Sequence, residues 1–131
     1  MVMDEQALVK LAAAARKQAY VPYSGFAVGA ALLAKSGRVY PGCNVENASY
    51  GLTICAERAA VFRAVAEGDR EFEAIAIVTE TGASPCGACR QVLREFGQDL
   101  QVIVADTKGN QRRHTLAELL PDDFGPSDLT R

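Results

Sequence analysis

The sequence predicts an α/β protein, a three-layer α/β/α sandwich built around a mixed, largely parallel sheet. Segments with helical periodicity alternate with short apolar segments of strand length. A strand, helix, strand connection returns parallel and right-handed, which places helices on the faces of such a sheet. A length of 131 residues suits one compact domain. We therefore expect a single domain over residues 1–131, with a tail from 124 to 131 whose end is loosely held.

The N-terminal third predicts a helix followed by a β-hairpin. Apolar residues recur at spacings of three and four over residues 5–18, which is typical of an amphipathic helix. The apolar segment 26–33 and the segment 38–43 predict two strands, and the Lys-Ser-Gly sequence at 35–37 predicts the turn between them.

The rest of the chain predicts helices and strands in alternation. Helical patterns cover residues 53–66 and 85–96, and apolar segments at 74–79 and 101–105 indicate buried strands. The Thr-Leu-Ala-Glu sequence at 115–118 matches a capping box, which predicts a short last helix before an irregular tail.

Charge and hydropathy argue against two classes of partner. Lys and Arg number 14 and Asp and Glu number 16, for a net charge of −2. The chain therefore lacks the excess of positive charge that is typical of nucleic-acid-binding domains. No apolar stretch approaches the roughly 18 residues that a membrane helix needs, and the N-terminus has no pattern of an export signal. We therefore expect a cytoplasmic protein without a membrane or nucleic-acid partner.

A Cys-x-x-Cys motif provides the first candidate for chemistry. Cys86 and Cys89 lie one helical turn apart at the expected start of a helix, and Pro85 suits the first turn. The helix dipole favours the thiolate that binds zinc. A redox dithiol of the thioredoxin type fits this motif equally well.

Cys55 favours a metal site over a redox dithiol. It lies near the start of another helix, where it can meet the first pair. Three cysteines at two helix starts suit a metal with an open fourth position, as in catalytic zinc sites. A closed structural site, with Cys43 or His114 as fourth ligand, remains the alternative.

Glu57 is a residue that a structural site would not require. A carboxylate beside an activated water can take its proton and pass it to a leaving group. Three thiolates leave a negative zinc site, and Arg58 and Arg90 are placed to offset that charge through hydrogen bonds to sulfur.

Four linked motifs resemble those of the small homotetrameric cytidine deaminases, within a match that runs in order from about Tyr20 to Phe124. They are Tyr23-Ser24-Gly25-Phe26-Ala27-Val28-Gly29-Ala30-Ala31-Leu32, Asn44-Val45-Glu46-Asn47, Cys55-Ala56-Glu57-Arg58 and Pro85-Cys86-Gly87-Ala88-Cys89-Arg90-Gln91. Cys-Ala-Glu followed by Pro-Cys-x-x-Cys is the signature of zinc deaminases in its three-cysteine form.

The resemblance implies a cytidine deaminase-like fold and a zinc-dependent hydrolase that acts on a cyclic amidine. Cys55, Cys86 and Cys89 resemble the ligands of one zinc per chain, and Glu57 resembles the proton shuttle. Zinc hydroxide would attack C4 of cytidine or deoxycytidine, with release of ammonia and formation of uridine or deoxyuridine. The implied role is pyrimidine salvage.

The resemblance also implies how a pyrimidine nucleoside is bound. Asn44 and Glu46 resemble a ribose clamp, Phe26 resembles the aromatic residue that stacks on the base, and Tyr50 is expected near the 5′ end of the sugar. Ala56 is expected to contact the substrate. Phe124 resembles a phenylalanine that reaches a neighbouring subunit's pocket, so a homotetramer with shared sites is expected.

Relatives of different specificity fit less well. Blasticidin S deaminases share the cysteine motifs, but the Phe26 segment and the Asn44-Val45-Glu46-Asn47 motif favour cytidine. Polynucleotide-editing deaminases generally need a basic or aromatic surface, and the chain has neither a basic run nor a tryptophan. We expect Cys43 to be a buried, inert thiol.

Overall fold

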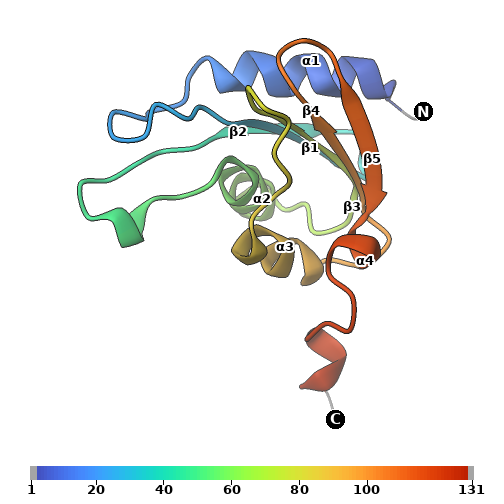
Figure 1. The fold of residues 1–131 in the computed structure, drawn as a ribbon. Helices are drawn as coiled ribbons and strands as arrows, with labels where there is room; N and C mark the ends of the chain where they lie inside the picture. The colour runs from blue at the N-terminus through green and yellow to red at the C-terminus, as the bar shows by residue number, and fades with distance from the viewer. Residues whose placement is uncertain (1–2, 130–131) are drawn as a thin grey trace.

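A computed structural model describes residues 3–129 of the chain, which form one five-stranded sheet with helices on both faces (Figure 1). The elements in chain order are α1 (Glu5–Arg16), β1 (Gly29–Ala34), β2 (Val39–Cys43), η1 (Tyr50–Leu52), α2 (Ala56–Ala66), β3 (Phe72–Val78), α3 (Gly87–Arg94), β4 (Gln101–Ala105), β5 (Gln111–Thr115), α4 (Leu116–Leu119) and η2 (Pro126–Asp128).

The sheet is mixed, as expected, but it is not largely parallel. Its strand order is β2-β1-β3-β4-β5, and among these neighbours only β3 and β4 run parallel. The prediction of a largely parallel sheet was wrong because β1 lies between β2 and β3 and runs antiparallel to both, and the edge strand β5 runs antiparallel to β4. The strands β2, β3 and β4 nevertheless all point in one direction.

Two apolar clusters fill the layers on either side of the sheet. Alternate residues of β1 face opposite ways: Ala30 and Leu32 join the cluster under α2 and α3, whereas Ala31 and Leu33 pack against α1. Figure 1 shows α1 alone on one face and α2 and α3 on the other. The expected three-layer α/β/α arrangement is thereby confirmed.

The predicted elements agree with the structure, with ends shifted by a few residues, and the capping box at Thr115 and Glu118 is present. The edge strand β5 was not predicted. Its sequence, Gln-Arg-Arg-His-Thr, has no apolar alternation, and its first three residues are exposed. The tail contains one short helix that was not predicted, η2, and its last residues, 130 and 131, where we expected a loosely held end, lie outside the described part.

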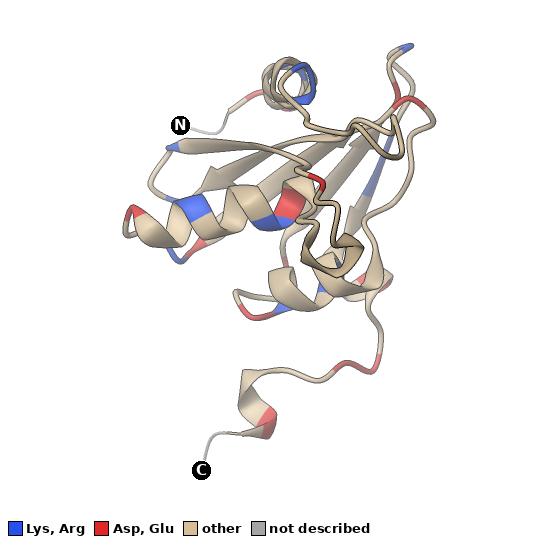
Figure 2. Ribbon diagram, turned by 90° about the vertical axis from the view of Figure 1, so that its left-hand side faces the viewer, with Lys and Arg blue, Asp and Glu red and all other residues tan. Residues whose placement is uncertain are grey.

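Charged residues of both signs are interspersed over the helices and loops, whereas the central strands are almost free of them (Figure 2). This mixture matches the near-zero net charge of the sequence. Among the helices of residues 3–129, none combines the length and the apolar character needed to cross a membrane.

Candidate metal centre

The sheet directs two helix starts to the same edge. Because β2 and β3 point the same way, the segments that follow them both emerge at their common carboxyl end. Cys55 is the N-cap of α2 and Cys86 is the N-cap of α3, and neither side chain makes a capping hydrogen bond. Both thiols are therefore available to a ligand near two positive helix ends.

The three predicted cysteines meet at this edge. The Sγ atoms of Cys55 and Cys86 are 3.8 Å apart and those of Cys86 and Cys89 are 3.5 Å apart. Tetrahedral zinc with Zn–S bonds of ~2.3 Å separates two sulfurs by about 3.8 Å. The cluster therefore fits zinc, and the family comparison below supports the same metal.

The alternative fourth ligands lie elsewhere. Cys43 ends β2 on the face that packs against α1, and it lines a small cavity with Ala15 and Gln18 of that region. His114 pairs with Val102 in the sheet, at the β5 edge. Among residues 3–129 the ligand atoms of three side chains, Cys55, Cys86 and Cys89, lie within 4.8 Å of one another. Three protein ligands are typical of zinc sites that keep a fourth position for water.

The surroundings of Cys55 favour its thiolate over its thiol form. Hydrogen bonds from Cys89 and Arg58 lower the pKa of Cys55 to about 5, against the opposing effect of burial. The Nη2 atom of Arg58 donates to Cys55 Sγ at 3.2 Å. Cys89 is fully buried, and its hydrogen bond to Cys55 and its burial raise its pKa.

Glu57 lies beside the sulfur cluster in the first turn of α2. It is only 4% exposed, and burial raises the pKa of its carboxyl, with a further contribution from the charge on Cys55. No ion pair is recorded for it among residues 3–129. A buried carboxyl of raised pKa that faces a cavity holds its proton more readily than an exposed one, which suits a group that accepts and returns protons.

Arg90 makes different contacts from those expected. Its Nε donates to the carbonyl oxygen of Pro85 at 2.8 Å and its Nη1 to that of Leu119 at 2.7 Å, where we expected a sulfur. Arg90 lies three residues past Gly87, in the first turn of α3, and its side chain turns back to the carbonyl oxygen of Pro85 before the helix. It therefore ties the residue preceding Cys86 to the end of α4.

A cavity of about 310 Å³ opens beside the cysteines and is large enough for a small ligand. Its lining joins side chains from both halves of the site: Ser24, Phe26, Val28, Asn44, Glu46, Thr53, Cys55, Glu57, Ile77, Thr79, Ala83, Ser84 and Cys86. Four predicted groups thus meet in one cavity: the metal ligands Cys55 and Cys86, the carboxyl of Glu57, the ring of Phe26, and the pair Asn44 and Glu46.

Asn44 and Glu46 also hold the segment that carries Phe26. Asn44 donates to the carbonyl oxygen of Phe26 at 2.8 Å and accepts from the amide of Val28 at 2.9 Å. Glu46 accepts from the amides of Tyr23 and Ser24 and from the Ser24 hydroxyl. These bonds, the hydroxyl first, keep the pKa of Glu46 below its usual value despite some burial.

The remaining predicted residues are placed unequally. Ala56 is fully buried behind the metal centre. Tyr50 lies outside the first cavity and lines an adjoining one of about 380 Å³ together with Glu46. Phe124 is 55% exposed and lines neither cavity, so within one chain it does not join the site.

Sequence reasoning missed polar residues of the cavity wall. Ser24 anchors Glu46, and Thr79, 2% exposed, accepts a hydrogen bond from the amide of Ala83 in the loop before Cys86. Thr53 lines both cavities. Ser24 lies inside a recognised motif and could have been singled out, whereas Thr79 at a strand end gives no such signal.

Comparison with known proteins agrees with this site. Residues 2–105 match the family model of the cytidine and deoxycytidylate deaminase zinc-binding region. The chain is 51% identical to a cytidine deaminase of Sporosarcina psychrophila, over 98% of this chain and 96% of that protein. It is 52% identical to one of Halalkalibacterium halodurans, over 97% and 98% respectively.

Solved structures give the same result. A cytidine deaminase from Burkholderia pseudomallei superposes with a TM-score of 0.91 and 53% identity, over 93% of this chain and all of that one. One from Mycobacterium tuberculosis superposes with a TM-score of 0.84 and 47% identity, over 95% and 100%. With its three-sulfur centre, this chain belongs to the zinc-dependent cytidine and deoxycytidylate deaminase family.

Proposed function

We propose that this protein catalyses the hydrolytic deamination of cytidine and deoxycytidine to uridine and deoxyuridine, with release of ammonia. One observation carries the proposal: a buried carboxyl, Glu57, lies beside three clustered sulfurs on the wall of a cavity of nucleoside size. The relatives named cytidine deaminase, about half identical over nearly the whole chain, support the same activity.

Cys55, Cys86 and Cys89 would hold one zinc per chain. When bound, zinc with water in its fourth position supplies an activated nucleophile at neutral pH. Arg58 keeps Cys55 in the thiolate form that the metal requires, and its Nε atom is buried without a hydrogen-bond partner in the described chain.

Glu57 would move the protons of the reaction. It would take a proton from the attacking water and deliver it to N3 of the cytosine ring as the water oxygen bonds to C4. It would then take the second proton from the new C4 hydroxyl and pass it to the 4-amino group. The bond between C4 and that nitrogen breaks, ammonia leaves, and the carbonyl of the uracil ring remains. Burial supports this role, because it raises the pKa of Glu57 toward the pH at which it must work.

The cavity wall would orient the nucleoside. Phe26 offers an aromatic face for the base, and Glu46 keeps acceptor capacity for a ribose hydroxyl because a carboxylate has about four lone-pair sites. Asn44 would assist at the 3′-hydroxyl while it holds the Phe26 segment. Tyr50, on the adjoining cavity, would lie toward the 5′ end of the sugar. The contact of Ala56 with the substrate stays a prediction that the lining of neither cavity supports.

We further propose a homotetramer whose sites are shared between subunits through Phe124. Large apolar side chains remain exposed on the single chain, and they include Tyr20, Tyr23, Val45, Tyr50, Leu52, Phe62 and Phe124. Burial of such side chains between copies would remove them from water. We assign the whole chain, 1–131, to one catalytic domain acting in pyrimidine salvage in the cytoplasm.

The ultraviolet spectrum of cytidine mixed with the purified protein, read alongside zinc content, tests this function. The proposal expects conversion to uridine, an equal amount of ammonia and about one zinc per chain. Zinc without conversion would favour another amino substrate or a structural site. A metal-free protein with a titratable Cys86–Cys89 disulfide would favour a dithiol oxidoreductase.

A further inference from the structure

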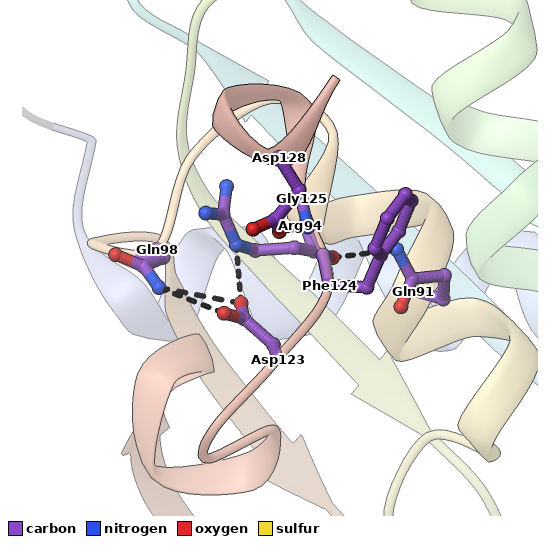
Figure 3. A network of polar contacts seen from close by, with 7 residues as sticks. All are labelled: Gln91, Arg94, Gln98, Asp123, Phe124, Gly125 and Asp128. Atoms are coloured by element: carbon purple, nitrogen blue, oxygen red, sulfur yellow. Dashed lines mark hydrogen bonds and ion pairs between the residues drawn. The ribbon is translucent and has the colours of Figure 1, made fainter. Parts of the chain in front are cut away.

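The C-terminal segment is held against α3 on both sides of Phe124. Asp123 forms an ion pair with Arg94, and both side chains are nearly buried, with exposed fractions of 10% and 13%. Gln98 donates to both carboxylate oxygens of Asp123 at 3.2 Å. Figure 3 shows Arg94 and Gln98 converging on this one carboxylate.

The backbone of Phe124 and Gly125 is fixed as well. The Nε2 atom of Gln91 donates to the carbonyl oxygen of Phe124 at 3.0 Å, and the amide of Gly125 donates to Asp128 at 2.9 Å (Figure 3). Gly125 lies against the guanidinium of Arg94: a Cβ atom there would stand 2.5 Å from Nη2 and 2.6 Å from Cζ.

None of these contacts involves the aromatic ring of Phe124. Phe124 remains 55% exposed, although its own carbonyl oxygen and the preceding residue, Asp123, are held by polar groups of α3 and the following loop. An aromatic residue that only anchored the tail would be expected to bury its ring. Here the backbone is anchored and the ring is presented to solvent.

We propose that Arg94, Gln98 and Gln91, acting on Asp123 and the Phe124 carbonyl, form a tail clamp that aims the Phe124 ring into the nucleoside site of a second copy of this chain. The clamp residues are positioning residues, since they act through Phe124 and touch no substrate. This inference rests on the proposed function, in which the sites are shared between subunits.

The tail clamp predicts an effect on KM rather than on turnover. D123N removes the charge that Arg94 and Gln98 hold, so the ring is no longer aimed and loses part of its stacking on the base. We expect KM for cytidine to rise about 3- to 10-fold, and F124A to raise it on the order of 10-fold or more. Zinc content and kcat should stay within about twofold of the wild type in D123N.

A double-mutant cycle separates positioning from general damage. If Asp123 acts through the ring, D123N should add nothing to KM in the F124A background. G125A offers a second way to open the clamp, because its new methyl group displaces the Arg94 guanidinium, and it should give the same KM shift. E67Q, which removes the charge from an exposed ion pair with Arg63, is the matched control.

The outcomes distinguish the clamp from the shared site. Unchanged KM in D123N and G125A, with raised KM in F124A, overturns the clamp and leaves the shared site standing. Unchanged KM in F124A overturns the shared site and the clamp with it. A D123N effect that persists in the F124A background also overturns the clamp, because Asp123 then acts on something other than the ring.

Discussion

The two faces of the sheet are built alike and used differently. On one face α1 packs over Gly29, and on the other α2 packs over Gly42; the two glycines lie one residue apart in the pairing of β1 with β2. A Cβ at Gly29 would come within 2.0 Å of the Ala12 carbonyl oxygen, and one at Gly42 within 2.4 Å of that of Ala56.

The chemistry gathers on the α2 face alone. Cys55, Cys86, Cys89 and Glu57 all lie at the starts of α2 and α3, whereas the buried cluster under α1 is apolar throughout. The difference shows that close helix packing is a requirement of the fold on both faces. Only on the α2 face does the same packing also set the position of reactive groups.

Removal of the metal should have the largest effect, because it should abolish activity at the α2 face and leave the packing on both faces intact. Chelation is expected to abolish cytidine turnover, because no other group in the site supplies the nucleophile. The far-ultraviolet circular dichroism of the metal-free protein should remain that of a folded chain, since two apolar clusters fill its core without the metal. Unfolding on chelation would instead identify the zinc as structural.

Substitution of Glu57 tests the proton transfer. E57Q should lower kcat for cytidine on the order of 10²- to 10⁴-fold, because the amide cannot accept and return a proton. Zinc content by atomic absorption should remain one per chain. E67Q, at the exposed end of the same helix, should keep wild-type kcat; full activity in E57Q would refute the role of Glu57.

Substitution of Gly29 and of Gly42 tests whether helix packing positions the metal site on the α2 face alone. G29A and G42A should each lower the free energy of unfolding by about 1–3 kcal/mol, because the new methyl group overlaps helix backbone. Only G42A should also weaken zinc binding, since it displaces α2 and with it Cys55. Equal loss of zinc affinity in both variants would show that helix packing on the α1 face also sets the position of the metal ligands.

Arg58 should give a smaller effect on the same face. R58Q removes the donor to Cys55 Sγ and leaves the thiolate less stabilised, so zinc affinity should fall about 10- to 100-fold. Competition with a chromophoric chelator measures this change. R63Q, on the exposed side of α2, is the control and should bind zinc as the wild type does.

Much of the site could be predicted because its signals are local. Cys55 and Cys86 each cap a helix after a strand end, so their spacing along the chain indicated where they would meet. Glu57 follows from its position two residues after Cys55. The four linked motifs also indicated the family, which the comparisons confirm.

The features that sequence reasoning missed depend on distant contacts. The central, antiparallel position of β1 is decided by its pairing with β3, some forty residues later in the chain. The strand β5 has a polar sequence because it is an exposed edge. Arg90 contacts Leu119, and Arg94 contacts Asp123, each 29 residues away, so their partners have no local signature.

The most direct test of the account is X-ray absorption at the zinc edge of the purified protein. The account predicts three sulfur ligands at about 2.3 Å and one oxygen at about 2.0 Å, which is an open three-thiolate site. Four sulfurs, or three sulfurs with an imidazole nitrogen, would mean that Cys43 or His114 closes the site. That result would contradict a catalytic centre at the carboxyl ends of β2 and β3.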